Sequence, residues 1–327
     1  RWNESSILTS IGQVYERLQQ YEQAGGYYEQ ALRIAKASMD RQGEGRILGS
    51  IGQMYKNLGQ YQNAYTTFQD SIAIYKALGT IDGLRRSQYG LASVEAYLNQ
   101  FESAITHYEQ ALDIIEELRA GLIEKEHKLS FIQDKLYVYD ELIDLLQTLH
   151  QQHPDKGYDR KALEIFERKQ GRVFLEEMGQ SGARNFAGIP DKILQQELDL
   201  QNQLNATRKQ LVDQRSKIIT EQNKDLIQTL EQREKTLIAA QVTLQDQIKT
   251  RYPDYYALRY PKPVSLADLQ QHVLQPGELL LVYHVMKEKT MLWVVGKETF
   301  GLYPLAVTVD ALTAQVTAPV RWVETVR

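Results

Sequence analysis

The sequence predicts a mainly α-helical protein, in which an α-solenoid of helical hairpins precedes an antiparallel coiled-coil hairpin and the first part of an α/β domain. Three observations predict this fold class. Helical patterns repeat every 40 residues in the first third of the chain, heptad-spaced leucines occupy residues 192–251, and short apolar runs bounded by turn residues follow residue 278. We therefore expect four domains, in the ranges 1–118, 119–185, 186–252 and 253–327.

Composition bounds the class of protein before any motif is considered. The 327 residues suffice for about two domains, and their net charge of -4 argues against a nucleic-acid partner, since such proteins usually carry a basic excess. The chain has no cysteine, which fits a reducing compartment and excludes a thiolate metal site. No apolar run reaches the roughly 18 residues of a membrane helix, and the start lacks a signal peptide. We expect a soluble, cytoplasmic protein, of which this chain, starting at Arg1, is a part.

Three segments that begin at Ile11, Ile51 and Leu91 align without gaps, so the period is 40 residues. Two antiparallel helices approach closely only where one side chain is small, and an aromatic ring then fills the space beside that contact. The aligned segments alternate in this way. Small residues recur at Gly12, Gly52 and Ala92 and at Ala24, Ala64 and Ala104, and aromatic residues recur at Tyr21, Tyr61 and Phe101 and at Tyr28, Phe68 and Tyr108.

These are the positions of the tetratricopeptide signature, and the three segments resemble tetratricopeptide repeats. The usual period of such repeats is about 34 residues. The six extra residues follow the second helix and contain glycine, so we expect a longer second helix and a loop there. The 40-residue form resembles the extended repeats of kinesin light chains and related scaffold proteins, with residues 40–44 matching their inter-repeat segment. The third repeat departs from the pattern at two positions. Ala92 replaces the glycine of the other repeats, and Glu95 replaces their tyrosine.

Binding residues of a solenoid are expected on the concave face that the first helix of each repeat forms, because stacking makes this surface continuous. The basic residues at these positions favour a partner protein or extended peptide of acidic character, and the side-chain amides can hold a peptide backbone. The alternative is an ordinary solvated face. Equivalent offsets give nine candidate partner-binding residues: Gln13, Arg17, Arg46, Gln53, Lys56, Asn57, Arg86, Ser93 and Tyr97.

The region after the repeats is also helical. Residues 113–149 and 162–178 have amphipathic patterns outside the 40-residue register, and we expect them to cap the open end of the solenoid. A linker is expected at residues 180–192. Beyond it, leucine or isoleucine recurs every seven residues on each side of the polar stretch 220–225, at Leu204, Leu211, Ile218, Leu230, Leu237 and Leu244. A polar break between two apolar seams favours two helices in an antiparallel coiled-coil hairpin, with one long dimerising coil as the alternative.

The composition changes again after Tyr252. Ser265 is a candidate N-cap, with Asp268 three residues later, for a short helix that ends at Val273, and a turn over residues 275–277 follows. Apolar runs that begin at Leu279, Met291 and Phe300 are short, rich in Val, Leu, Tyr and Trp, and separated by turn residues, so they predict strands. A helical pattern starts at residue 309. This order indicates the opening of an α/β domain.

The whole order of elements resembles the bacterial TPR-CHAT proteins, in which tetratricopeptide repeats precede a caspase-like CHAT domain. The resemblance covers nearly the whole chain and rests on four features: the repeats, the helix at residues 162–178, the coiled-coil hairpin from Ile189, and the segments SLADLQQHVLQPGELLLVYHV and MLWVVG. CHAT domains are caspase-like cysteine peptidases. The resemblance implies that the chain ends before the half of the domain that carries the catalytic histidine and cysteine.

No catalytic, cofactor-binding or metal-binding residue is predicted, because a cysteine peptidase needs a thiolate nucleophile and this chain has no cysteine. His150 and His153 could share a metal, but they flank a proline break without a third ligand, which favours an ordinary loop. His284 ends a predicted strand, where an exposed polar residue is ordinary. The first functional hypothesis is therefore an interaction and regulatory region. The alternatives are a part of an active caspase-like endopeptidase and a scaffold that self-associates through its coiled coil.

Overall fold

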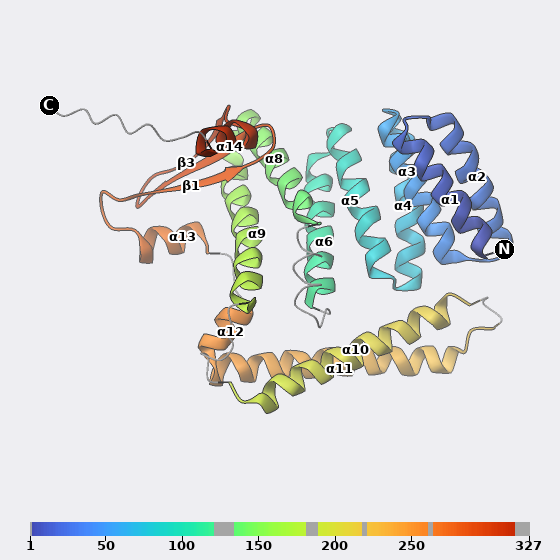
Figure 1. The fold of residues 1–327 in the computed structure, drawn as a ribbon. Coiled ribbons are helices and arrows are strands. Elements are labelled where there is room, and N and C mark those ends of the chain that lie inside the picture. Colours follow the sequence, from blue (N-terminus) through green and yellow to red (C-terminus); the bar gives the residue numbers. More distant parts are fainter. Residues whose placement is uncertain (1, 121–133, 181–188, 218–220, 261–263, 318–327) are drawn as a thin grey trace. The chain divides into compact units, whose positions relative to one another are not determined.

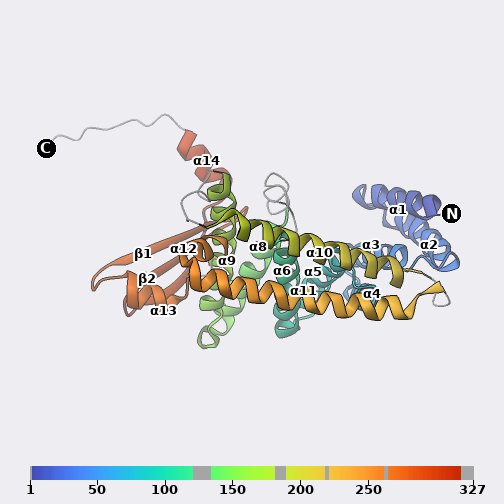
Figure 2. The same cartoon turned by 90° about the horizontal axis from the view of Figure 1, so that it is seen from below.

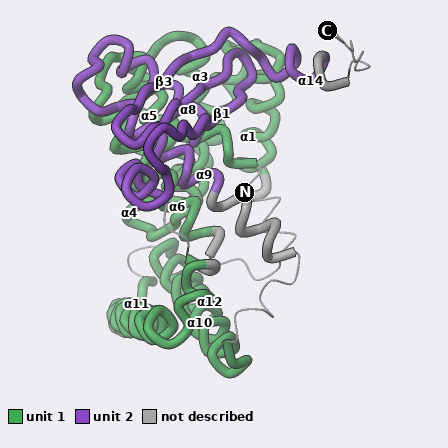
Figure 3. The backbone as a smooth tube through the Cα atoms, turned by 90° about the vertical axis from the view of Figure 1, so that its left-hand side faces the viewer, with its two compact units in different colours: residues 1–138, 175–260 green, residues 139–174, 261–327 purple. Residues whose placement is uncertain are grey.

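The computed structural model describes residues 2–120, 134–180, 189–217, 221–260 and 264–317. Most of the linker expected at residues 180–192 lies outside these ranges. The chain forms two compact units, which Figure 3 shows in different colours. The first comprises residues 1–138 and 175–260, and the second comprises residues 139–174 and 261–327.

Three helical hairpins open the first unit (Figure 1). Their helices are α1 (Trp2–Arg17), α2 (Tyr21–Ala37), α3 (Arg41–Asn57), α4 (Tyr61–Leu78), α5 (Ile81–Tyr97) and α6 (Phe101–Ala120). Each hairpin turns at a residue with a left-handed backbone, as is common directly after a helix. These residues are Gln19, Gly59 and Asn99, with φ of 59°, 71° and 59°. Because they are one period apart, the backbone conformation repeats with the sequence.

The interlock of small and large side chains predicted for the hairpins is confirmed. A Cβ atom at Gly12 would lie 2.6 Å from the Tyr28 ring, and one at Gly52 would lie 3.0 Å from the Phe68 ring. Glycine therefore allows the close approach of the first helix to the second. The two rings are buried together with alanines and aliphatic residues of the repeats, which include Ala24, Ala31, Ala35, Ile47, Ala64 and Ile72.

The loops expected between the repeats are present but short, and Gly79 lies in one of them with φ of 73°. In the structure three residues separate α2 from α3, and two separate α4 from α5. Gly45 and Gly83 lie inside α3 and α5, where a Cβ atom would be 3.1 Å and 2.3 Å from the Tyr75 ring. The extra residues of the long period therefore extend the helices, and these glycines permit close helix packing.

Helices α10 (Asp191–Arg215) and α11 (Lys224–Arg251) lie side by side in Figure 2, and α12 (Pro253–Arg259) follows them. They run in opposite directions, because Gln241 donates to Gln201 whereas Arg215, later in α10, donates to Glu231, earlier in α11. Ile218 lies outside the described residues. The other leucines of the two predicted seams are buried: Leu204, Leu211, Leu230, Leu237 and Leu244. The seams are filled within one chain, which favours the hairpin over a single dimerising coil.

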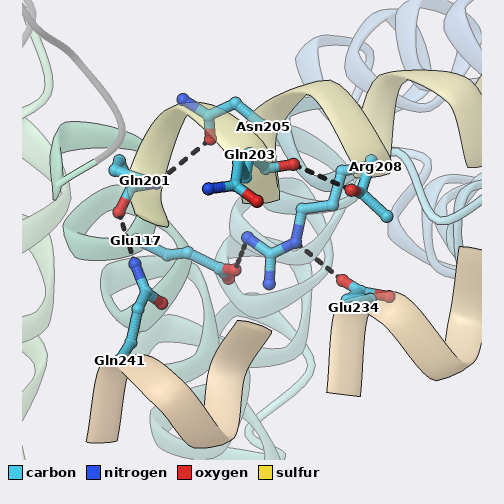
Figure 4. Close-up of polar contacts among 8 residues, drawn as sticks. Glu117, Gln201, Gln203, Asn205, Arg208, Glu234 and Gln241 are labelled. Carbon is cyan, nitrogen blue, oxygen red and sulfur yellow. Dashed lines mark hydrogen bonds and ion pairs between the residues drawn. The ribbon is translucent and has the colours of Figure 1, made fainter. Parts of the chain in front are cut away.

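Charged side chains join this hairpin to the repeats (Figure 4). Arg208 of α10 approaches Glu117 of α6, with 2.5 Å between Nη1 and Oε1. Its Nε donates to Glu234 of α11 at 2.7 Å. One guanidinium thus contacts carboxylates from two other helices, which the planar fork of arginine permits.

The second unit combines two helical segments with a small sheet. Its helical segments are residues 139–152 of α8 (Leu136–Gln152) and residues 158–174 of α9 (Tyr158–Gln180), with a 3₁₀ turn over Pro154–Lys156 between them. The predicted strands are confirmed as β1 (Leu279–Val285), β2 (Thr290–Gly296) and β3 (Phe300–Leu305), in an antiparallel sheet of order β1-β2-β3.

The predicted cap before the sheet is also confirmed. Ser265 Oγ accepts a hydrogen bond from the backbone N–H of Asp268 at 3.0 Å. It begins α13 (Leu266–Asp268), which continues as a π-helical turn over Leu269–Val273. Helix α14 (Val309–Thr317) follows the sheet.

The two faces of the sheet differ in exposure, because successive side chains of a strand point to opposite faces. Met291, Trp293 and Val295 of β2 are fully buried on one face, where the Trp293 ring lies 5.2 Å from Phe166 of α9. The opposite face is exposed along β1 and β3, at Leu279, Leu281, Tyr283, Val285 and Tyr303. The helical segments of this unit therefore cover one face of the sheet.

The compact units do not coincide with the four ranges expected from the sequence. Residues 139–174, expected to cap the solenoid, form a unit with the strands, because the apolar side of α9 packs on the sheet. The four domain ranges stay a prediction. No helix in the described part of the chain has an apolar stretch long enough to cross a membrane.

Candidate functional site

A pocket with a volume of about 460 Å³ lies over the first helices of the three repeats. Helices α1, α3 and α5 supply most of its lining, and we call it the groove pocket. Because side chains from three successive repeats meet there, the pocket can accept a segment longer than one residue. Six of the nine candidate partner-binding residues line it: Gln13, Arg17, Arg46, Gln53, Asn57 and Arg86.

The other three candidates lie outside this lining. Lys56 Nζ donates to Ser93 Oγ at 3.1 Å and lies 5.8 Å from the centre of the Tyr89 ring. Ser93 is buried, so the expectation that it would be exposed on this face is corrected. Tyr97 is exposed and stacks on Tyr61, with ring centroids 4.6 Å apart.

Side-chain amides of the groove pocket form a chain of hydrogen bonds. Gln53 Nε2 donates to Asn57 Oδ1 at 2.8 Å, and Asn57 Nδ2 donates to Glu16 Oε1 at 2.9 Å. The second oxygen of Glu16 accepts from the Tyr28 hydroxyl at 2.7 Å. Asn57, expected to hold a partner's backbone, therefore also joins the second repeat to the first.

Glu16 is the acidic residue among those that line the groove pocket. Burial raises its pKa above the usual value of 4.5, although the hydrogen bond from Tyr28 and the charge of Arg17 act in the opposite direction. Burial and the neighbouring Glu16 likewise raise the pKa of Tyr28, so its hydroxyl stays protonated and donates. Glu16 lies one residue before Arg17 and at the same offset as Lys56, so the period alone could have identified it.

Three arginines give the groove pocket its positive charge. Arg46 Nη1 donates to Ser6 Oγ at 3.3 Å, and Arg86 Nε lies 3.6 Å from Asp82 Oδ2. Both contacts are at least partly accessible to water, so each arginine keeps capacity for a further acceptor in its five-donor guanidinium.

Aromatic residues line another part of the groove pocket, and the sequence did not identify them. Tyr89 and Tyr137 contact each other edge to face, with ring centroids 5.1 Å apart. Phe68 and Tyr75 of α4 also contribute. Tyr137 follows the repeats outside their register, and only folding brings it to this surface. The pocket therefore offers both charge-assisted hydrogen bonds and apolar contact.

A second polar cluster lies in the other compact unit. Asp140 Oδ1 accepts from His284 Nε2 at 2.8 Å and from Lys169 Nζ at 2.6 Å. Burial by itself would raise the pKa of Asp140, but the hydrogen bonds from His284 and Lys169 outweigh it and hold the pKa below 3.8. Lys289 donates to Gln147 at 2.8 Å nearby.

This cluster corrects the expectation for His284, which is buried and not exposed. Its partner Asp140 lies 144 residues away in the sequence, which no local pattern reveals. The Asp140 carboxylate joins α8 to β1 and α9, because it binds both His284 and Lys169. The sequence has no cysteine that could place a thiol beside this cluster. The described ranges contain no group of three acidic, histidine or cysteine side chains placed to hold a metal ion. His150 lies 3.8 Å from Asp159, and neither forms such a group with His153.

Comparison with known proteins identifies the repeats. No curated protein matches the chain. The family model of the tetratricopeptide repeat matches residues 3–77 and, in a second placement, residues 43–117. These ranges coincide with helices α1 to α6 and with the first helices that form the groove pocket. Residues 3–117 are therefore tetratricopeptide repeats, a type of repeat that generally binds proteins or peptides.

Proposed function

We propose that this chain is the interaction and regulatory region of a TPR-CHAT protein, whose groove pocket binds an extended, acidic segment of a partner protein. The observation that carries the proposal is the convergence of Arg17, Arg46 and Arg86 on one pocket. They come from three different first helices of an otherwise slightly acidic chain. Guanidinium groups bind carboxylates through charge-assisted hydrogen bonds, and a positive pocket also speeds association with an acidic segment.

The remaining lining supports an extended peptide as the form of this segment. Gln13 and Gln53 occupy equivalent positions in successive repeats, and Gln13 Nε2 lies 3.5 Å from Ser50 Oγ. Amides spaced by one repeat can each hydrogen-bond a peptide backbone, in either orientation of the amide. The aromatic residues Tyr89 and Tyr137 provide apolar contact for a side chain of the same segment.

The CHAT assignment for residues 253–327 belongs to the same proposal. It is supported by the order of a capped helix, a turn and three short strands after a coiled-coil hairpin, as in the proteins that the chain resembles. Under this proposal the repeats and the hairpin bind the partner, and this binding regulates the α/β region. Cleavage of a peptide bond by a cysteine would need residues outside this chain.

The test of the groove pocket is a peptide selection. Random dodecapeptides selected on the chain should be enriched in Asp and Glu. The double variant Arg17→Glu, Arg86→Glu should bind the enriched peptides about 1 to 3 kcal/mol more weakly by calorimetry. The control variant Arg33→Glu, Lys76→Glu makes the same charge change on exposed second-helix positions and should leave affinity unchanged. Peptides that bind the groove variant as tightly as the wild type would place the site elsewhere.

A further inference from the structure

The two ends of the groove pocket differ in charge. Arg46 and Arg86 are 40 residues apart in the sequence, so they occupy equivalent positions near the starts of α3 and α5. Asn57 lies eleven residues after Arg46 in the same helix, which corresponds to about 16 Å along the helix axis. Because Asn57 hydrogen-bonds Glu16, one end of the pocket contains Arg46 and Arg86, whereas the other contains Glu16 beside Arg17.

The charges around each end make this difference definite. At the Glu16 end, Arg17 follows in the same helix, the Tyr28 hydroxyl donates from α2, and neutral Asn57 donates from α3. The charges of Glu16 and Arg17 therefore offset each other. At the other end, Asp82 lies at 3.6 Å from Arg86, and about half of each side chain is exposed. An exposed pair of this kind is weakly coupled, so Arg46 and Arg86 keep a net positive potential.

We propose that Glu16 determines how a partner segment lies in the groove pocket, with acidic residues at the Arg46 and Arg86 end and a neutral residue facing Glu16. This proposal rests on the acidic-segment function above. A partner carboxylate near Glu16 would meet a like charge, and one of the two N–H donors of Asn57 is already bound to Glu16. About five residues of extended chain, at roughly 3.3 Å each, span the distance between the two ends. Glu16 thus selects a charge pattern within one short segment.

The experiment measures fluorescence anisotropy with three labelled hexapeptides. The first is hexaglutamate. The second has two glutamates followed by four glutamines, and the third has four glutamines followed by two glutamates. Glu16→Gln keeps the shape of the side chain and removes its charge. The variant should bind hexaglutamate about three- to tenfold more tightly than the wild type, whereas the tighter of the half-acidic peptides should change by less than about twofold.

Two controls separate this effect from fold and from bulk charge. Glu22→Gln makes the same charge change at an exposed position of α2 and should alter none of the three affinities. A thermal melt of each variant should show an intact fold. An equal gain for all three peptides would overturn the positional role of Glu16, and no gain for hexaglutamate would overturn any role in selection.

A further variant, Arg46→Gln with Arg86→Gln, keeps the failure of this inference distinguishable from failure of the proposed function. If it binds all peptides like the wild type, the acidic-segment function itself is wrong. If it weakens binding while Glu16→Gln changes the affinity for all three peptides by the same factor, the inference alone is wrong. Absence of binding to every peptide by both the wild type and Glu16→Gln would overturn both.

Discussion

The repeats and the sheet-containing unit are held together by contacts of different sequence range. In the repeats, Gly12 packs on Tyr28 and Gly52 on Phe68, so the same contact recurs after 40 residues and joins neighbouring helices. In the other unit, Trp293 Nε1 donates to the backbone carbonyl of Asp159, 134 residues away, and His284 bonds Asp140 across 144 residues. The repeats are therefore held by local, periodic contacts, which the sequence shows directly. The sheet-containing unit depends instead on a few buried residues whose partners lie far away in the chain.

The largest effect is expected from Trp293 of β2, which is fully buried against α9. Trp293→Ala should cost about 3 to 5 kcal/mol, because it leaves a large cavity against Phe166. Hydrogen exchange should accelerate in β1 to β3 while α1 to α4 keep their protection. The control is Tyr303→Ala, since Tyr303 lies exposed on the opposite face of the same sheet. Equal loss of protection in the repeats would contradict the division into two units.

The next effect concerns Asp140, whose carboxylate binds both His284 and Lys169. Asp140→Asn should lower the free energy of unfolding of this unit by about 2 to 3 kcal/mol at neutral pH. Because the folded-state pKa lies below 3.8, this stabilisation is present above that value and is lost as the pH falls through the folded-state pKa.

Denaturant titrations from pH 7 to pH 3 check this prediction. The difference between wild type and Asp140→Asn should be constant near neutrality and shrink below about pH 4. Glu164→Gln, at an exposed position of α9, is the matched control and should show no such difference. A difference independent of pH would mean that charge at Asp140 is not the cause.

A smaller effect is expected within the repeats, from two glycines of neighbouring helices. Gly12→Ala places a Cβ atom 2.6 Å from the Tyr28 ring and should destabilise the repeats by about 1 to 3 kcal/mol. Gly26→Ala is its matched control, because no atom lies within 4 Å of the added Cβ. It should stabilise α2 by about 0.5 to 1 kcal/mol through helix propensity. Thermal melts of both variants decide this, and effects of the same sign would contradict the interlock.

The smallest effect is expected from Glu16→Gln on stability. Burial raises the pKa of Glu16 in the folded state above 4.5, so the wild type loses stability relative to the variant as the pH rises through the folded-state pKa. The variant should therefore be slightly more stable at pH 7, by less than about 1 kcal/mol, and equal to the wild type near pH 4. Unfolding measured at both pH values tests the sign. A larger gain at pH 4 would be the contrary result.

The sequence predicted the repeats because each hairpin buries residues that are close together in the chain. Small and aromatic positions recur at a fixed period, and the turns at Gln19, Gly59 and Asn99 follow the same period. The strands and the Ser265 cap were also predicted, since alternation and capping are local patterns. For the candidate site, equivalent offsets found six lining residues but missed Glu16 and Tyr137, and they included the buried Ser93.

What the sequence by itself determined is therefore the type and order of elements: the repeats, the heptad seams of α10 and α11, and the three strands. Tertiary structure alone decided which elements pack together. It placed Phe166 under Trp293, His284 on Asp140 and Tyr137 in the groove pocket. The physical reason is that periodicity reports which face of an element is apolar, whereas the partner of that face depends on shape and charge contributed by residues far away in the chain.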